Sequence, residues 1–192
     1  DKSMRVAVFE VVSALTTTGY STTSYVAWPA AGLYLLLLLM VIGGGTGSTA
    51  GALKQRRIHL LASTVWWELQ KLGAPRRAII DRSVWRGDGG GRGLVADRAI
   101  VEVSAFAVAY LAILATGAGV LVAYGYSVQE SLFEYASALG TVGLSVGVTT
   151  SATPAPVLWC ETAGMFLGRL EIFIVFIALR RLWGDGRDVL RS

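Results

Sequence analysis

The sequence predicts an all-α integral membrane protein, built from repeats in which a re-entrant loop lies between membrane helices. Hydrophobic residues make up 54% of the 192 residues and charged residues 16%, whereas about 25% are charged in soluble domains. Uncharged segments long enough to cross a bilayer recur along the chain. In addition, the segment Phe9–Thr22 (FEVVSALTTTGYST) returns as Phe133–Val146 (FEYASALGTVGLSV), with 8 identities in 14 positions. Such an internal repeat indicates duplicated structural units.

Each copy is an apolar stretch with one carboxylate, followed by a polar tail of the form T-x-G-x-S. The tails resemble the TVGYG sequence of potassium-channel filters, in which backbone carbonyls replace the water around a cation. Glycine lets the backbone turn its carbonyls toward an axis where a side chain would clash. For one copy alone, a helix C-terminus followed by a glycine turn is the simpler explanation; two copies favour a filter. The predicted ion-binding residues are Thr17, Thr18, Gly19, Tyr20, Thr141, Val142, Gly143 and Leu144, with potassium at Thr17, Thr18, Gly19, Thr141, Val142 and Gly143.

The first copy leads into a predicted membrane crossing. Met4–Thr16 is expected to form a re-entrant helix, and Pro29 is a natural start for the next one. Trp28–Leu53 holds no charge and its 26 residues are enough for a hydrocarbon core of about 30 Å. Gly43–Gly51 (GGGTGSTAG) interrupts it, and irregular backbone at that depth is tolerated only where it lines a cavity or is buried in protein.

The glycine-rich loop is predicted to be a gate. A phosphate-binding loop requires Lys after its last Gly, and a dinucleotide fingerprint requires a further Gly; the sequence here has neither. Close packing of helices through small residues remains the structural alternative. We expect a flexible element beneath the filter, formed by Gly43, Gly44, Gly45, Thr46, Gly47, Ser48, Thr49, Ala50 and Gly51.

The middle of the chain is basic. Lys54–Arg98 holds ten Lys or Arg against four acids, with an amphipathic helix expected at Ile58–Leu72 and a flexible turn at Gly87–Gly93. A connection of this kind between membrane segments is more simply a cytoplasmic loop than a nucleic-acid-binding patch. Two further crossings, Ala99–Tyr126 and Val157–Leu179, enclose the second re-entrant helix, Val128–Gly140, and its tail.

The distribution of charge predicts the topology. The loops on the tail side, Thr22–Trp28 and Val146–Pro156, contain no Lys or Arg, so the positive-inside rule places both tails near the outer face. The chain is thus divided into 1–53 (pore helix, filter and broken inner helix), 54–98 (cytoplasmic), 99–183 (the next repeat) and 184–192 (cytoplasmic tail).

Arg169 is the most informative charge, because a cation in mid-helix costs about 3 kcal/mol to insert and needs a partner or water. It directly follows the sequence MFLG, which aligns with the sequence MVIG at the start of the glycine-rich loop. It either pairs with Glu161 or Glu171 and merely packs helices, or projects below the filter, holds the loop and opposes cations. Glu10 and Glu134, at matching positions, either add negative potential at the outer mouth or anchor the filter by buried hydrogen bonds; the latter is favoured.

Residues for other chemistry are scarce. Cys160 and His59 are the single cysteine and histidine, which disfavours a disulfide framework, a Cys-based metal site and a His-dependent triad. No convincing nucleophile–base pair is present either. We therefore expect no enzyme activity and no cofactor in this chain, only a transported ion.

Four motifs in order, SALTTTGYS, GGGTGSTAGALK, SALGTVGLS and MFLGRLEIF, resemble the Trk/Ktr/HKT superfamily of potassium transport proteins, in particular its TrkH/KtrB membrane subunits. The resemblance spans nearly the whole chain. It implies four membrane helix–pore loop–membrane helix repeats around one pseudo-fourfold pore, with the last two repeats here and the first of them partial. It also implies a gating loop at Gly43–Gly51, an Arg beneath the filter at Arg169, and a homodimer regulated by a cytosolic nucleotide-binding ring of TrkA or KtrA type.

The resemblance predicts potassium uptake across the plasma (inner) membrane of a bacterium or archaeon. Gly19 and Gly143 match the glycines that accompany potassium preference in the family, but two repeats supply only half a filter, so this segment alone is not expected to conduct. The two tails also differ at the position after the glycine, which is Tyr20 in the first copy and Leu144 in the second. The alternatives are a transporter permeable to both sodium and potassium, and a non-conducting membrane scaffold that binds a cytosolic regulator.

Overall fold

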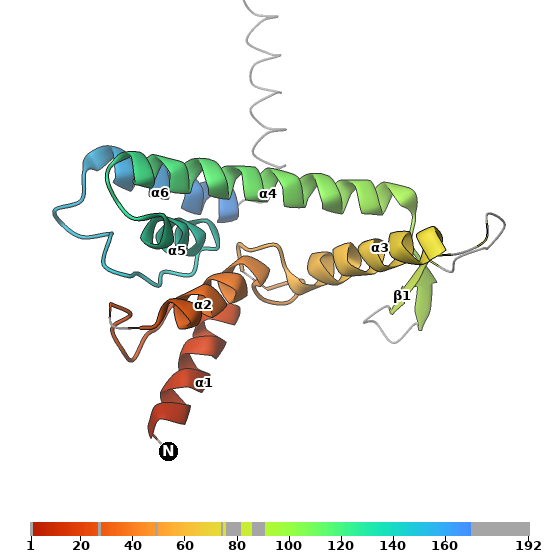
Figure 1. Cartoon of the computed structure of the whole chain (residues 1–192), viewed down its shortest axis with the longest axis horizontal. Helices are drawn as coiled ribbons and strands as arrows, with labels where there is room; N and C mark the ends of the chain where they lie inside the picture. Colours follow the sequence, from red (N-terminus) through yellow and green to blue (C-terminus); the bar gives the residue numbers. More distant parts are fainter. Residues whose placement is uncertain are drawn as a thin grey trace, which may run out of the picture.

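The computed structural model describes residues 2–26, 28–48, 50–73, 75, 82–85 and 91–169. Figure 1 shows one long helix, α4 (Asp97–Ala123), along one side of the molecule. The helices α5 (Val128–Leu139) and α6 (Ala155–Arg169) pack against each other and against α4, while α3 (Gln55–Gly73) packs along the first part of α4. The remaining helices, α1 (Lys2–Leu15) and α2 (Ala30–Ile42), pack on each other, and α2 also packs on α5.

Helix α4 is the one helix in the described ranges whose length and composition suit a membrane crossing. Its 27 residues extend about 40 Å at 1.5 Å per residue. Helix α2 is apolar but has 13 residues, about 20 Å, which is less than a hydrocarbon core of about 30 Å. The predicted crossing Trp28–Leu53 is therefore not one helix: α2 ends at Ile42, immediately before Gly43, as the glycine-rich loop predicts, and α3 begins only at Gln55.

Predicted and observed bounds agree closely for the two re-entrant helices, since α1 and α5 begin or end within two residues of the predicted positions. Pro29 is the N-cap residue of α2, with φ −64° and ψ 146°. The start of α5 is fixed by a capping box. The Ser127 side chain accepts from the Glu130 amide, and the Glu130 side chain accepts from the Ser127 amide. The predicted third crossing, Val157–Leu179, is described only as far as Arg169.

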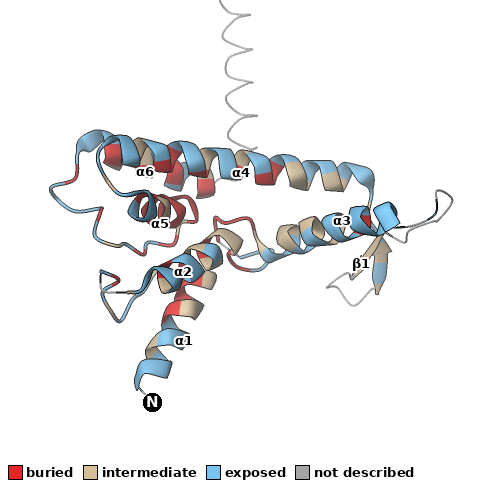
Figure 2. Cartoon of the chain, in the orientation of Figure 1, coloured by how far each residue is buried: buried red, intermediate tan, exposed pale blue. Residues whose placement is uncertain are grey.

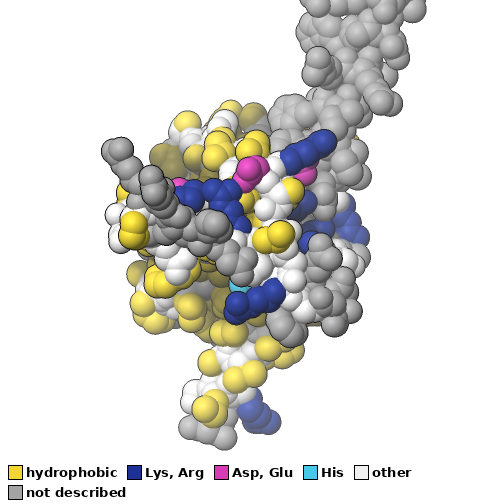
Figure 3. Space-filling model, turned by 90° about the vertical axis from the view of Figure 1, so that its right-hand side faces the viewer, with side chains coloured by type: hydrophobic (Ala, Val, Ile, Leu, Met, Phe, Trp, Pro, Cys, Tyr) yellow, Lys and Arg dark blue, Asp and Glu magenta, His cyan; other side chains and the backbone are white. Residues whose placement is uncertain are grey.

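The basic middle region contains a feature that the sequence did not predict. Instead of only a flexible turn at Gly87–Gly93, the strands β1 (Ser83–Trp85) and β2 (Arg92–Leu94) form an antiparallel pair, with Val84 opposite Gly93. Three-residue strands are too short to show an alternating pattern. Figure 3 views the molecule from this end, where Lys and Arg side chains gather on the surface.

Two buried clusters hold the helices together (Figure 2). One lies between α4, α5 and α6 and extends to Leu53 at the end of the glycine-rich loop. The other joins the two repeats, because Phe133 of α5 and Leu144 of the second tail pack with Tyr25, Leu36 and Met40 of the first repeat; its members are Ala14, Tyr25, Leu33, Leu36, Met40, Phe133, Val142 and Leu144. The two T-x-G-x-S tails are therefore held side by side.

Candidate functional site

The two tails have the same backbone geometry. In the first, Thr17 and Gly19 have left-handed φ angles of 55° and 81°; in the second, Thr141 and Gly143 have 53° and 96°. A left-handed φ is unusual for Thr and readily adopted by Gly. The same unusual conformation at two alternate residues in both copies indicates that the geometry belongs to the repeat.

Each tail is held by the last turn of the helix that precedes it. The amide of the first tail residue donates to the carbonyl of the repeated Ala, and the amide of the second donates to the carbonyl of the repeated Ser. These bonds are Thr17–Ala14 (3.3 Å), Thr18–Ser13 (3.0 Å), Thr141–Ala138 (3.0 Å) and Val142–Ser137 (2.9 Å). The last carbonyls of a helix have no amide partner within the helix. Here they accept from the tail amides and so hold the tail in place.

The hydroxyl of the repeated Ser also bonds the tail backbone, with a different partner in each copy. Ser13 Oγ donates to the carbonyl of Tyr20 (2.6 Å), whereas Ser137 Oγ accepts from the amide of Gly143 (3.1 Å). Both serines are buried. The signal for them was present in the sequence, since they are among the identities of the repeat.

Glu10 and Glu134 are buried anchors, with exposed fractions of 0% and 3%. Glu10 accepts from the amide and hydroxyl of Thr22 (2.8 and 2.9 Å) and from the Tyr25 hydroxyl. Burial and the bond to Glu10 raise the pKa of Tyr25, so its hydroxyl keeps the proton that it donates. The buried hydrogen bonds expected for Glu10 are present: the carboxylate ties the segment after the first tail back to α1.

Glu134 does the same in the second copy, with more partners. It accepts from Ser145 Oγ (2.6 Å), from the Val146 amide (3.0 Å), and from the amide and hydroxyl of Thr149 (3.1 and 2.6 Å). Val146 and Thr149 lie 124 residues after Thr22 and Tyr25, the offset of the repeat. The anchoring scheme is thus duplicated although the anchored residues differ.

The two tails touch at their glycines. A Cβ atom on Gly19 would lie 1.8 Å from the Val142 carbonyl oxygen, so only glycine fits there. The side chains at the next position are placed differently, because Tyr20 is 72% exposed and Leu144 is 3% exposed. The backbone atoms of the two tails are therefore adjacent, whereas the side chains after the glycines are not equivalent.

The glycine-rich loop folds back on the end of α2 and reaches the base of the second tail. The amides of the residues after the loop donate to carbonyls at the end of α2 and in the loop. These bonds are Leu53–Val41 (3.1 Å), Lys54–Ile42 (2.9 Å) and Gln55–Gly44 (3.1 Å). Gly51 donates to the carbonyl of Gly140 (3.3 Å), immediately before the second tail. A Cβ atom on Gly51 would lie 3.0 Å from Thr141 Oγ1 and 3.1 Å from the carbonyls of Gly140 and Gly168.

Arg169 lines a cavity of about 260 Å³ together with this loop. Its walls carry the basic residues Lys54, Arg57 and Arg169; the lining is Ser48, Ala50, Gly51, Ala52, Lys54, Arg57, Phe106, Gly168 and Arg169. The alternative in which Arg169 pairs with Glu161 is not what the structure shows, since Glu161 instead contacts Thr149. The residues lie two helical turns apart, about 12 Å. Glu171, the other predicted partner, and Thr49 of the loop lie outside the described residues.

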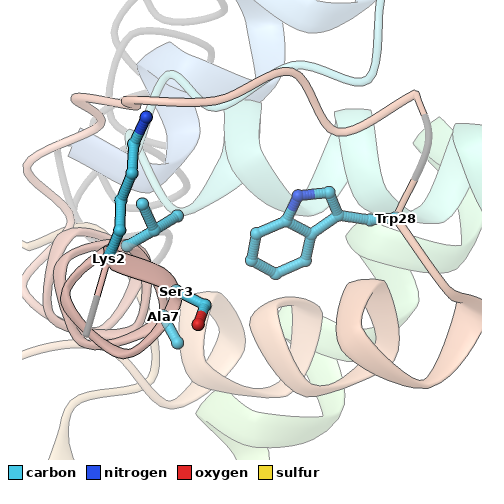
Figure 4. A pocket seen from close by; sticks show the side chains of 5 residues that line it. Lys2, Ser3, Ala7 and Trp28 are labelled. Carbon is cyan, nitrogen blue, oxygen red and sulfur yellow. The ribbon is translucent and has the colours of Figure 1, made fainter.

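A larger cavity of about 570 Å³ lies elsewhere, between the first half of α1 and Trp28. Figure 4 shows the indole of Trp28 facing Ser3 and Ala7 across it, with Lys2 at its edge. Its lining is mainly hydrocarbon, and it lacks the converging oxygens that a dehydrated cation needs. It is not the candidate ion site.

A protein-family model described as "Cation transport protein" (TrkH) matches residues 1–185. The chain belongs to the TrkH family. TrkH-family relatives include the Trk system potassium uptake protein TrkH of Escherichia coli, 36% identical over 183 residues, which cover 89% of this chain and 35% of that protein. An uncharacterised cation transporter of Methanocaldococcus jannaschii is 32% identical over 179 residues, which cover 92% of this chain and 36% of that protein.

The crystal structure of the potassium transporter TrkH from Vibrio parahaemolyticus is similar to this fold, with a TM-score of 0.78 and 31% sequence identity, over 93% of this chain and 37% of that one. The chain thus spans about a third of the length of the relatives that it matches. The predicted superfamily is confirmed, and this chain is a largely helical member of the TrkH family.

Sequence reasoning missed several residues that shape the site of this TrkH-family chain. Thr22, Tyr25 and Thr149 were treated as parts of polar connecting segments, yet they bond the two glutamates. The repeat offset relates Tyr25 to Thr149, but the residues are unlike, so an identity count passes over them. Gly168 was not singled out either, although a Cβ there would lie 1.9 Å from the Leu139 carbonyl oxygen.

Proposed function

We propose that the full-length protein takes up potassium through a filter lined by backbone carbonyls, to which this chain contributes two of four segments. The observation that carries the proposal is the geometry shared by the two tails: left-handed Thr and Gly at matching positions, one Ser and one Glu anchoring each tail, and contact between the tails at Gly19. Backbone carbonyls held in fixed positions can replace the hydration shell of a cation.

The proposed ligands are the oxygens of Thr17, Thr18, Gly19, Tyr20, Thr141, Val142, Gly143 and Leu144. No covalent chemistry is required, because the membrane potential supplies about 2.3 kcal/mol per charge per 100 mV. In this proposal four repeats surround one pore in the plasma membrane. The tails face outward and the basic region 54–98 faces the cytoplasm, where a nucleotide-binding ring of TrkA or KtrA type regulates a homodimer.

The glycine-rich loop 43–51 is the proposed gate, and Arg169 is its electrostatic partner. Support comes from the position of Gly51 against Gly140, Thr141 and Gly168, directly below the second tail. The cavity that Arg169 shares with the loop carries two further basic residues, and positive charge at that place raises the energy of a passing cation. The loop and the charge together would close the pathway.

Rubidium uptake into liposomes by the full-length protein tests the gate. Gly51→Ala should raise flux because the added Cβ does not fit between Thr141 Oγ1 and two carbonyl oxygens, so the loop cannot close below the filter. Arg169→Ala should also raise flux. Gly45→Ala is the matched control, since a Cβ there meets nothing within 4 Å. If Gly51→Ala and Arg169→Ala conduct like wild type in a folded protein, the gate assignment is wrong.

A further inference from the structure

The carboxyl group of Glu161 in α6 occupies a site that the filter proposal does not use. Glu161 is 2% exposed, and both of its carboxyl oxygens lie close to the hydroxyl oxygen of Thr149, at 3.1 and 3.0 Å. The same Thr149 hydroxyl oxygen lies 2.6 Å from Oε1 of Glu134, the anchor of the second tail. One hydroxyl thus stands between two buried carboxyl groups.

Counting hydrogens shows that this arrangement needs one more proton. A threonine hydroxyl carries a single hydrogen, so it can donate to Glu134 or to Glu161 but not to both. If both carboxyl groups were ionised, the oxygens of one of them would face the lone pairs of Thr149 Oγ1, with no hydrogen between the oxygen atoms. An additional proton on one carboxyl group, donated to Oγ1, removes the repulsion.

The other hydrogen bonds decide which carboxyl group holds the proton. Glu134 already accepts from Ser145 Oγ and from the amides of Val146 and Thr149, so donor hydrogens already point at both of its oxygens and leave little room for one more. Within the described part of the chain, Thr149 is the only hydrogen-bond partner of Glu161. Thr149 therefore donates to Glu134, and Glu161 is the group that can donate to Thr149.

The charged surroundings agree with a neutral Glu161. The titratable groups that face it are Glu134 and Tyr135 of α5 and its neighbour Cys160. On α6, the basic residue within the described range is Arg169, about 12 Å further along the helix. The charged residues of α4 are in its first six residues, while the part of α4 beside Cys160 is Gly117, about 22 Å beyond them. A buried carboxylate without a cation is costly.

We propose that Glu161 carries a proton at neutral pH and, through Thr149, positions the carboxylate of Glu134 that anchors the second filter segment. The chain of hydrogen bonds runs from the Glu161 hydroxyl to Thr149 Oγ1 and from the Thr149 hydroxyl to Glu134 Oε1. It ties the inner helix α6 to the segment after the filter. At the 124-residue offset of the repeat, the first copy has Leu37 in place of Glu161, so this tie is specific to the second repeat.

Glu161 is a positioning residue, and its protonation has a consequence for transport that rests on the proposed function. Deprotonation in alkaline solution would place a second negative charge beside Glu134 and break the bond to Thr149. The second tail would then lose its tie to α6. We expect rubidium uptake by the full-length protein to fall at alkaline pH as this proton is lost.

Infrared spectroscopy of the full-length protein in liposomes tests the proton directly and does not depend on transport. The difference spectrum of wild type minus Glu161→Gln at neutral pH should contain the carbonyl absorption of a protonated carboxylic acid, because the lipid esters and the other carboxyl groups cancel in the difference. Glu102→Gln is the matched control, because Glu102 is exposed on α4 and its removal should leave the absorption unchanged. If the difference spectrum of wild type minus Glu161→Gln contains no such absorption, the proposal is wrong.

The pH profile of rubidium uptake then tests the positioning role. Glu161→Gln, whose amide can donate to Thr149 as the acid does, should keep uptake within about twofold of wild type at neutral pH and lose the alkaline decline. Glu161→Ala should reduce uptake about tenfold, in line with the loss of one buried hydrogen bond. If Gln is as damaging as Ala, the ionised form is the functional one and the proposal fails. An absence of uptake in wild type would instead contradict the proposed function, and the infrared result would still stand.

Discussion

The two repeats anchor their tails in the same way, but the helices that precede the tails, α1 and α5, are covered very differently. In α5, Ser131 and all residues from Phe133 to Leu139 are buried, because α4 and α6 both pack against it. In α1, the exposed fractions of Met4, Val8 and Val12 are 70%, 57% and 51%. The same kind of helix is thus enclosed in one repeat and largely uncovered by the described chain in the other.

The residues that stay buried in both repeats are the informative ones. The buried residues of α1 are Glu10, Ser13 and Ala14, and each is identical to its counterpart in α5, namely Glu134, Ser137 and Ala138. The Ser and Ala residues bond the tail through a side chain or a carbonyl, and the Glu residues bond the segment that follows the tail. The comparison teaches that the duplicated unit kept the groups that hold the tail, while the outer surfaces of the helices diverged.

The largest effect should come from removing the anchors, and it should be unequal. Glu134→Ala leaves four described hydrogen-bond donors without their acceptor and Glu10→Ala leaves three. At about 1–3 kcal/mol for each buried unsatisfied group, both variants should lose several kcal/mol, and Glu134→Ala more. Thermal unfolding of the full-length protein measures this. A larger loss for Glu10→Ala would break the comparison.

The next effect concerns the close approach of α6 to α5. A Cβ on Gly168 would lie 1.9 Å from the Leu139 carbonyl oxygen, so Gly168→Ala must move backbone and should cost about 1–3 kcal/mol. Gly119→Ala on α4 meets nothing within 4 Å and should be neutral or slightly stabilising. The two unfolding temperatures should differ by several degrees; equal values would mean that the helices do not pack this tightly.

A smaller effect should separate the two serines. Ser137→Ala removes the acceptor of the Gly143 amide, whereas Ser13→Ala removes a donor to the Tyr20 carbonyl. A carbonyl left with an unused lone pair is better tolerated than a buried amide without an acceptor. Each should cost about 1 kcal/mol, and Ser137→Ala should lower the preference for potassium over sodium more. Rubidium uptake with sodium as competitor measures this, and a larger loss in Ser13→Ala would contradict it.

The smallest effect concerns the start of α5, where Ser127→Ala removes a capping box. We expect a loss of about 1 kcal/mol or less with unchanged ion preference, because the box lies at the end of α5 away from the tail. Circular dichroism during thermal unfolding, together with rubidium uptake, measures both. A change in ion preference would show that the helix start also positions the filter.

Much of the fold was predictable because it depends on strong local signals. The internal repeat located both re-entrant helices, Pro29 located the start of α2, and the glycine run located its end. The charge distribution separated the basic middle from the apolar segments. The β1–β2 pair was not predictable, since three-residue strands leave no alternation of polar and apolar residues to detect.

The site was only partly predictable, because some of its contacts join residues far apart in the sequence. The glutamates and tails follow from the repeat itself. The partnership of Thr149 with Glu161, and the fit of Gly51 between Gly140 and Gly168, arise only when α5, α6 and the glycine-rich loop pack together. Charge alone left Glu161 open as one of two partners for Arg169, but the spacing of Glu161 and Arg169 along α6 places them about 12 Å apart.

The measurement that tests the central claim most directly is rubidium uptake into liposomes by the full-length protein, with sodium as competitor, for Gly143→Ser and Gly119→Ser. Gly143 has φ 96° in the second tail, and no atom lies within 4 Å of a Cβ there, so the substitution strains the filter backbone without a clash. If the tails form the filter, Gly143→Ser should lose its preference over sodium, while Gly119→Ser behaves like wild type. Unchanged preference in a folded Gly143→Ser protein would contradict the account.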